Sequence, residues 1–134
     1  MDSIEWDIEN PLVKELIEAA RIMHWGSISI GLALGLRAGI KAMGALELQR
    51  KQADRVNVRG SYCFAQGVEV ITGCSMLRGK MAFAHSTGGD ALLDLWGQGK
   101  HIRIKPNNMV SGDGRQIMNA RESDIFEDME IVKL

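Results

Sequence analysis

This 134-residue chain has two cysteines, and their spacing limits the chemistry that they could carry out. Cys63 and Cys74 are eleven positions apart, and a helix between them would separate their Cα atoms by about 16 Å, too far for a disulfide bond. The helix dipole would favour the thiolate form of Cys63, at the N-terminal end, but not that of Cys74. Cys63 is therefore the candidate catalytic nucleophile or soft-metal ligand, and Cys74 is expected to be packed or structural. Alternatively, both are small buried hydrophobic residues.

Two histidines could also take part in chemistry. His24 stands at the expected end of a helix, where its imidazole could supply a nitrogen ligand or could cap a backbone carbonyl group. His85 stands at the end of an expected strand and is most simply explained as a solvated side chain. Zinc binds imidazole nitrogen and thiolate sulfur, so the candidate metal ligands are His24, Cys63 and Cys74, and zinc is the candidate cofactor.

The composition excludes several classes of protein. The formal net charge is −1 and no run of Lys or Arg forms a basic stripe, so we expect neither a nucleic-acid partner nor a membrane partner. The longest strongly apolar stretch covers positions 28–36, which is far shorter than the about 20 residues that cross a bilayer. An acidic N-terminus and the absence of a disulfide framework are typical of a cytoplasmic protein. The length fits a single domain over residues 1–134.

The first part of the chain predicts a pair of helices. An Asn-Pro start followed by apolar residues at helical spacing predicts an amphipathic helix over positions 10–24. A second helix is expected over positions 30–52, with Gly31, Gly35 and Gly39 on one face. Because each glycine weakens a helix by about 1 kcal/mol relative to alanine, this stripe indicates that another backbone passes close by. That backbone could belong to a sheet, to another helix or to a second copy across a dimer axis.

The rest of the chain predicts strands with helices between them. Positions 63–74 contain β-branched residues but also a helical stripe, and we predict a helix that ends at Gly73. Glycine-rich turns join the next three strands, which predicts an antiparallel meander. This order of elements is typical of an α+β fold. The predicted strands cover positions 55–59, 80–85, 91–96, 101–105 and 131–134, and a short helix covers 115–121.

Three blocks of this sequence look like a known family. Positions 25–39 are similar to a region in which the family has H-G-H-x-C-P-G followed by a helix of the form L-A-x-G-x-R-A-G. Cys63 and positions 72–74 are similar to a second block, C-x-x-D-A-I-Q-x-x-T-G-C, in which Gln66 replaces the acidic residue. Positions 125–131 are similar to a closing E-L-F-E-V-R-E segment. In order and spacing the blocks resemble the formylmethanofuran dehydrogenase E-subunit family.

The resemblance implies a thioredoxin-like α+β core, in which helices flank a mixed sheet, and a role in anaerobic metabolism. It also implies a homodimer or a hetero-oligomer with a paralogue from the family. The motif differs at its metal positions, since Trp25 and Ser27 stand where the family has histidines, Ser29 replaces the cysteine and Ile30 the proline. Serine hydroxyls are poor zinc ligands, so we expect the family metal site to be absent or weakened.

The expected site lies where the first block meets Cys63, and three functions remain open for it. The chain could be an accessory or ligand-binding protein that has lost the family metal site. It could be a metal- or thiol-dependent enzyme that uses Cys63. It could also be a subunit whose missing ligands come from an intact paralogue, with Trp25, Ile28 and Ile30 at the interface. The predicted ligand-binding residues are His24, Trp25, Gly26, Ser27, Ser29, Gly31 and Cys63.

Overall fold

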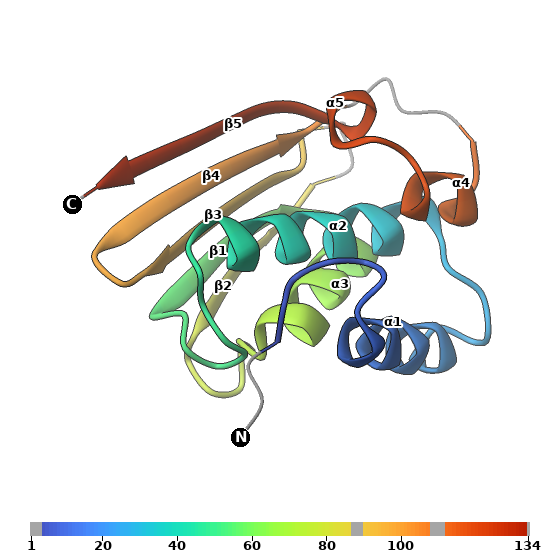
Figure 1. Cartoon of the computed structure of the whole chain (residues 1–134), viewed down its shortest axis with the longest axis horizontal. Coiled ribbons are helices and arrows are strands. Elements are labelled where there is room, and N and C mark those ends of the chain that lie inside the picture. Colours follow the sequence, from blue (N-terminus) through green and yellow to red (C-terminus); the bar gives the residue numbers. More distant parts are fainter. Residues whose placement is uncertain (1–3, 87–89, 108–111, 134) are drawn as a thin grey trace.

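The computed structural model describes residues 4–86, 90–107 and 112–133. In this part of the chain five helices and five strands form a sheet and a helical layer (Figure 1). No helix among these residues is long and apolar enough to cross a membrane. The helices are α1 (Pro11–Met23), α2 (Ile30–Ala45), α3 (Tyr62–Thr72), α4 (Gly114–Met118) and α5 (Glu122–Ile125), and the strands are β1 (Arg55–Gly60), β2 (Met81–His85), β3 (Leu92–Gly97), β4 (Lys100–Pro106) and β5 (Phe126–Lys133).

The five strands form one mixed sheet in the order β2-β1-β3-β4-β5. β1 is parallel to β2 and antiparallel to β3, so that Val58 lies opposite Phe83 on one side and Leu93 on the other. β4 and β5 extend the sheet in antiparallel orientation. The predicted α+β class is therefore confirmed.

The predicted antiparallel meander is wrong for β2. This strand pairs with β1 rather than with β3, because α3 carries the chain from β1 across to a parallel strand at the edge of the sheet. The chain then returns to the other side of β1 to form β3. Positions 87–89 of the glycine-rich turn predicted between β2 and β3 lie outside the described residues. The hairpin between β3 and β4 is confirmed, and its turn places Gln98 and Gly99 at positive φ (54° and 68°).

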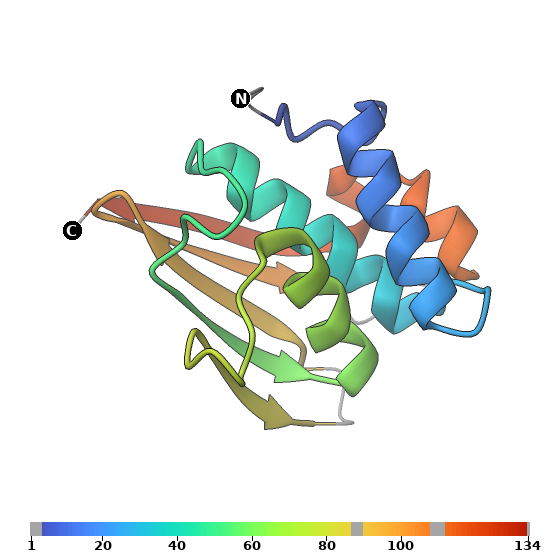
Figure 2. The same ribbon diagram turned by 90° about the horizontal axis from the view of Figure 1, so that it is seen from below.

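The helices lie on one side of the sheet and leave its other face uncovered (Figure 2). β1 and β4 therefore alternate between buried and exposed residues, as half-buried strands do. In β1, Val56 and Val58 are buried under the helices, whereas Arg55, Asn57 and Arg59 are exposed. The hydrophobic core fills the space between the inner face of the sheet and the helical layer.

A network of polar side chains stabilises the uncovered face of the sheet. Asp94 on β3 is only 7% exposed, because its carboxylate lies 2.7 Å from His101 Nε2 and accepts hydrogen bonds from Arg103 at 2.8 and 3.2 Å. Trp96 stacks on His101 with ring centroids 4.5 Å apart, and the guanidinium of Arg55 lies 4.2 Å from the Trp96 ring. These contacts join β1, β3 and β4 where no helix covers them.

The first two helices begin where the sequence predicts, but the second ends earlier than predicted. Asn10 caps α1 by accepting a hydrogen bond from the backbone nitrogen of Leu12 (2.8 Å). The prediction that α2 continues to position 52 is wrong, because the chain leaves the helix after Ala45 and turns back to bury Leu48 completely. Trp6 holds that turn in place, since its indole N–H donates to Leu48 O at 2.6 Å.

The C-terminal segment places α4 against α2 and then returns to the sheet. Arg37 on α2 donates hydrogen bonds to the carbonyl oxygens of Ile117 (3.0 Å) and Met118 (2.9 Å). The short helix predicted over positions 115–121 corresponds to α4, which ends earlier, at Met118, and a second short helix, α5, follows it. The closing strand starts at Phe126, earlier than the predicted position 131, and pairs with β4 along its length.

α2 and α3 run side by side in the same direction and touch through their glycines (Figure 2). A Cβ atom at Gly35 would overlap the backbone oxygen of Phe64, and a Cβ atom at Gly67 would lie 2.6 Å from a backbone nitrogen of α2. Gly39 faces Ile71 in the same manner, with 3.0 Å between the Cβ positions. The backbone that approaches the predicted glycine stripe is therefore that of α3.

Alanine at Gly35 or Gly67 should destabilise the protein, because the added methyl group meets backbone atoms that move only if the two helices separate. We expect each substitution to lower the free energy of unfolding by at least about 2 kcal/mol, despite the gain in helix propensity. Urea unfolding followed by circular dichroism measures the change. Gly44→Ala in the same helix is the control, since only Trp6 lies near that position (3.2 Å). Similar effects of all three substitutions would contradict the prediction.

Candidate functional site

The N-terminal ends of α2 and α3 lie next to each other, because Gly31 leaves no side chain between them. A Cβ atom at Gly31 would lie 2.8 Å from Ser61 Oγ and 3.2 Å from Cys63 Cβ. Ser29 caps α2 and Ser61 caps α3, and each hydroxyl accepts a hydrogen bond of 3.1 Å from a backbone N–H in the first turn. The positive ends of two helix dipoles therefore meet in one small region.

Cys63 is in contact with His24 in this region. The sulfur lies 3.7 Å from His24 Nε2, and both residues are partly buried. His24 is the C-cap residue of α1, and the packing of α1 against α3 brings its imidazole to the sulfur. The imidazole of His24 thus contacts a thiol. A thiol beside an imidazole can transfer its proton to the ring, which is how cysteine nucleophiles are activated.

Exposed aromatic residues adjoin both members of this pair along the chain. Trp25, next to His24, has a positive φ of 64° and is 97% exposed. Positive φ is unfavourable for a bulky residue. The turn after α1 therefore holds Trp25 in an uncommon backbone conformation, with its side chain in solvent. Tyr62, next to Cys63, is also exposed and stacks on His85 with ring centroids 4.6 Å apart.

Gly26 and Ser27 belong to a different part of the surface. They line a groove of about 640 Å³ between α1 and α4, together with apolar side chains of both helices. His24, Ser29 and Cys63 are not among the residues that line this groove. The structure therefore divides the predicted ligand-binding residues into a helix-end cluster of His24, Ser29, Gly31 and Cys63 and a separate groove wall.

Cys74 lies just beyond the other end of α3 from Cys63, so the two thiols do not share a site. Cys74 is fully buried, and its backbone N–H donates to Thr72 Oγ1 (3.1 Å). Burial raises the pKa of the Cys74 thiol, and the hydrogen bond with Thr72 and the charge of Lys80 only partly oppose that shift. The thiol form of Cys74 is thus the stable one, as expected for a packed side chain.

The residues of the helix-end cluster do not make a complete zinc site. Two ligands on a tetrahedral zinc ion lie about 3.6 Å apart, which is close to the 3.7 Å between Cys63 Sγ and His24 Nε2. A zinc site needs at least three protein ligands, and no group of three or more His, Cys, Asp or Glu residues arranged to hold a metal occurs among residues 4–86, 90–107 and 112–133. Ser29 adds only a hydroxyl that already caps α2.

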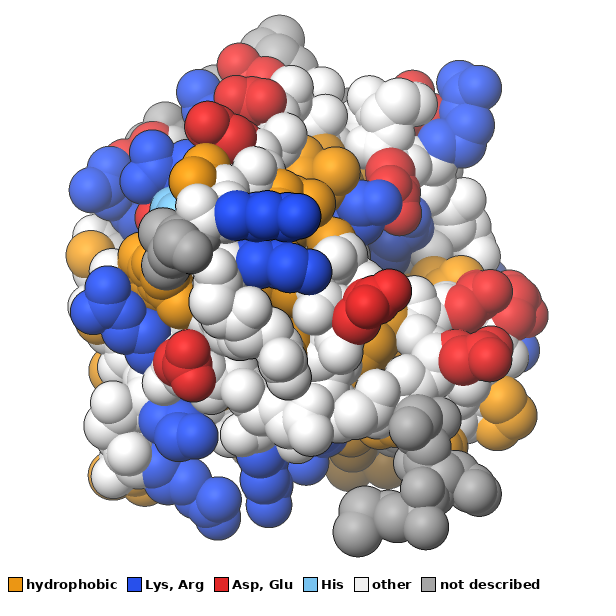
Figure 3. All heavy atoms as spheres, turned by 60° about the vertical axis from the view of Figure 1, so that its left-hand side comes forward, with side chains coloured by type: hydrophobic (Ala, Val, Ile, Leu, Met, Phe, Trp, Pro, Cys, Tyr) orange, Lys and Arg blue, Asp and Glu red, His pale blue; other side chains and the backbone are white. Residues whose placement is uncertain are grey.

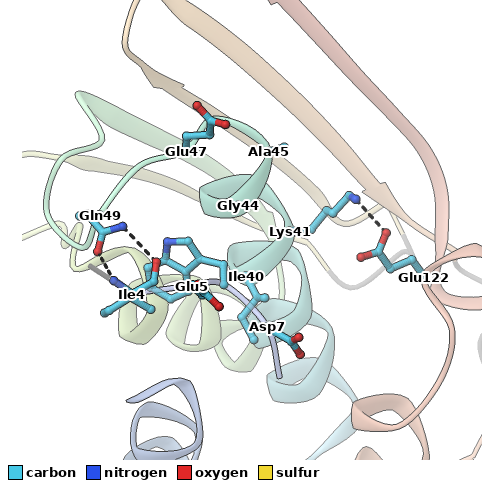
Figure 4. Close-up of a pocket in the computed structure, with 11 residues that line it drawn as sticks. Ile4, Glu5, Asp7, Ile40, Lys41, Gly44, Ala45, Glu47, Gln49 and Glu122 are labelled. Carbon is cyan, nitrogen blue, oxygen red and sulfur yellow. Dashed lines mark hydrogen bonds and ion pairs between the residues drawn. The ribbon is translucent and has the colours of Figure 1, made fainter. Parts of the chain in front are cut away.

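A second hollow, of about 560 Å³, lies between the N-terminal segment and α2 (Figure 4). Gln49 holds the N-terminal segment by two hydrogen bonds with the backbone of Ile4 (2.6 and 3.0 Å), and Lys41 forms an ion pair with Glu122 at 2.9 Å. The carboxylates of Asp7 and Glu47 point away from each other in Figure 4. This arrangement does not bring acidic groups together around a cation.

The predicted site residues did not include Ser61 or Tyr62, which lie beside the helix-end cluster. Ser61 is the N-cap of α3. A serine just before the predicted helix could have indicated this cap. The stacking of Tyr62 on His85 joins α3 to β2, and no local sequence pattern signals it. The contact between His24 and Cys63 also joins residues that are far apart in the sequence.

Comparison with known proteins places the chain in a family. The family described as FmdE, molybdenum formylmethanofuran dehydrogenase operon, matches residues 24–130. No curated protein gives a significant match. The matched range begins at His24, contains Cys63 and extends into β5, so it includes the helix-end cluster and nearly the whole sheet. The match covers well over half of the sequence, and the chain therefore belongs to the FmdE family.

Proposed function

We propose that this member of the FmdE family is an accessory or ligand-binding protein whose metal site is degenerate. The observation that carries the proposal is the composition of the helix-end cluster. In the part of the chain that the structure describes, His24 and Cys63 bring one nitrogen and one sulfur together there. Ser29, at the position of the family cysteine, uses its hydroxyl to cap α2. Two donors are too few to retain zinc tightly.

The same cluster suits a small anionic ligand. The first backbone N–H groups of a helix have no partners inside the helix, and the positive end of the dipole favours negative charge. Here two such ends, of α2 and α3, lie side by side, with a thiol and an imidazole between α1 and α3. The thioredoxin-like core and the role in anaerobic metabolism that the resemblance implies stay predictions.

A second candidate function is thiol-dependent catalysis by Cys63. It is favoured by the 3.7 Å contact between the sulfur and His24 Nε2, which provides a base for the thiol proton. Cys63 would then be the nucleophile and His24 the residue that accepts its proton. This candidate needs a reactive Cys63, whereas ligand binding alone does not.

A third candidate is a role within a hetero-oligomer whose other member, a paralogue, supplies further ligands. Trp25, which replaces a family histidine, and Ile30, which replaces a proline, are 97% and 41% exposed beside the cluster, while Ile28 is half-buried. Exposed apolar side chains next to a polar site are typical of a surface that a partner covers. Size-exclusion mass measurement with and without a co-expressed paralogue distinguishes this candidate.

Restoring the family residues should create a metal site that the natural chain lacks. We expect the purified wild-type protein to hold no stoichiometric zinc, and the variant with Trp25→His, Ser27→His and Ser29→Cys to bind it, because the variant restores three strong donors of the family motif in the segment between α1 and α2. Elemental analysis and zinc titration against a chelator measure both. Adding Cys63→Ser to that variant is the control and should weaken its binding. Stoichiometric zinc, molybdenum or tungsten in the wild-type protein would refute the degenerate site.

Cys63 should react with iodoacetamide much faster than Cys74. We expect a ratio of initial rates of at least about ten near neutral pH, because Cys63 is partly exposed beside His24, whereas Cys74 is fully buried and its pKa is raised. Peptide mass spectrometry gives the rate at each site. Cys63→Ser should remove the fast phase and Cys74→Ala should leave it. A His24→Gln variant that labels as fast as the wild type would remove the support for thiol catalysis but not for ligand binding.

A further inference from the structure

The turn between α3 and β2 carries two apolar side chains into solvent. Leu77 is fully exposed (101%) and Met76 is 58% exposed, whereas Cys74 at the base of the turn is fully buried. Single exposed hydrophobic residues are common on protein surfaces. Two in succession at the tip of a turn, however, form a small apolar protrusion. Figure 1 shows this turn in yellow-green at the lower left of the molecule.

Backbone hydrogen bonds hold the tip of this turn in shape. The carbonyl oxygen of Ser75 accepts a hydrogen bond from the backbone N–H of Lys80, and that of Met76 accepts one from Gly79, both at 3.0 Å. Gly79 has a positive φ of 73°, a conformation that favours glycine. The two apolar side chains are therefore presented from a fixed backbone, and little chain entropy is lost when they enter an apolar phase.

Basic residues lie on both sides of the apolar tip. Arg78 follows it directly and is exposed, and Lys80 is half-buried at the end of the turn. A second segment packs beside the base of the turn, because the backbone N–H of Lys51 donates to Thr72 O at the end of α3 (2.8 Å). This segment also contributes Arg50, whose guanidinium donates to another carbonyl oxygen of α3 (3.0 Å). Four cationic side chains thus come from two adjacent segments.

Acidic residues are absent from both segments. Positions 48–53 and 73–81 contain these four basic residues and no Asp or Glu. Figure 3, which brings this side of the molecule forward, shows Lys and Arg side chains gathered at its lower left. The expectation of no membrane partner rests on the net charge of the whole chain, −1. Attraction to a charged surface acts within a Debye length, about 10 Å, and therefore depends on the local charge instead.

We propose that the turn at positions 75–79 is a docking point for an anionic lipid surface. Met76 and Leu77 enter the boundary of the acyl chains, while the four basic side chains stay at the level of the lipid headgroups. Peripheral binding of this kind combines an apolar contact with a basic one, since a single weak signal does not hold a protein on a membrane.

A protein partner fits this turn less well than a lipid surface does. Stable protein interfaces bury about 800 Å² on each side, far more than two side chains provide. Four cations without an acidic neighbour also suit a surface of one charge better than the mixed charges of a protein. The inference is independent of the proposed function, because the turn lies beyond the C-terminal end of α3 and the helix-end cluster lies at its N-terminal end.

Co-sedimentation of the full chain with vesicles tests the binding. We expect the protein to sediment with vesicles of phosphatidylcholine and phosphatidylserine but not with phosphatidylcholine alone, and high salt should weaken the binding. Arg78→Glu should lower the affinity about tenfold or more, because it changes the local charge by two. Arg115→Glu makes the same change at an exposed position on α4. It is the matched control and should leave the affinity nearly unchanged.

Leu77→Ser tests the apolar part of the contact. We expect this substitution to lower the affinity for the anionic vesicles about tenfold or more, because it removes the side chain that enters the acyl boundary. Since Leu77 is fully exposed, the circular dichroism spectrum and the urea unfolding midpoint should stay as in the wild type. Ile22→Ser, at a 64% exposed position on α1, is the matched control and should bind as the wild type does.

Several results would overturn the proposal. One is a wild-type chain that binds neither kind of vesicle, and another is binding to both kinds alike. Leu77→Ser that binds as well as the wild type, or binding that is lost with Ile22→Ser instead, would place the contact elsewhere. A complex with a protein that depends on Leu77, without any binding to vesicles, would assign the turn to a protein partner and equally contradict a lipid surface.

Discussion

The close packing of α2 on α3 is the constraint on which the rest of this structure depends. Gly35 and Gly67 let the two helix backbones touch, and any side chain at either position would separate them. Since the helices run in the same direction, this contact also fixes the relative position of their N-terminal ends. Ser29 and Ser61 then cap neighbouring helices, and Cys63 takes the space beside Gly31. The chemistry of the cluster is thus a consequence of helix packing.

The helix-end cluster combines the N-terminal ends of two helices with two side chains that can bind a metal, His24 and Cys63. Helix dipoles and N–H groups are backbone properties, which remain when side chains change. Zinc ligands are individual side chains, and serine at positions 27 and 29 cannot replace nitrogen or sulfur. Under the proposed function, this chain retains the electrostatic part of the family site and lacks the coordinating part. Binding of an organic anion by such a relative requires no new backbone geometry.

The sequence predicts those parts of the fold that local patterns determine. The Asn10 cap, the αL residue Gly73 at the end of α3 and the glycine stripe each depend on neighbouring residues, and the structure contains all three. The predicted end of α2 was wrong because the burial of Leu48 and its hydrogen bond with Trp6 involve distant parts of the chain. The predicted pairing of β2 with β3 was wrong for a similar reason, since the strand order depends on the edge of the sheet to which α3 carries the chain. In the site, Cys63 could be singled out in advance, but its contact with His24 spans 39 positions.

The backbone conformation of Trp25 has a practical consequence for observing this protein in solution. The chain has three tryptophans, and two of them are held by other groups: Trp6 by Leu48 and Trp96 between Arg55 and His101. Trp25 is almost fully hydrated and directly follows His24. Its fluorescence should therefore be the red-shifted component of the emission spectrum, and the one most sensitive to quenchers in the solvent. The molecule carries a built-in optical reporter beside its helix-end cluster.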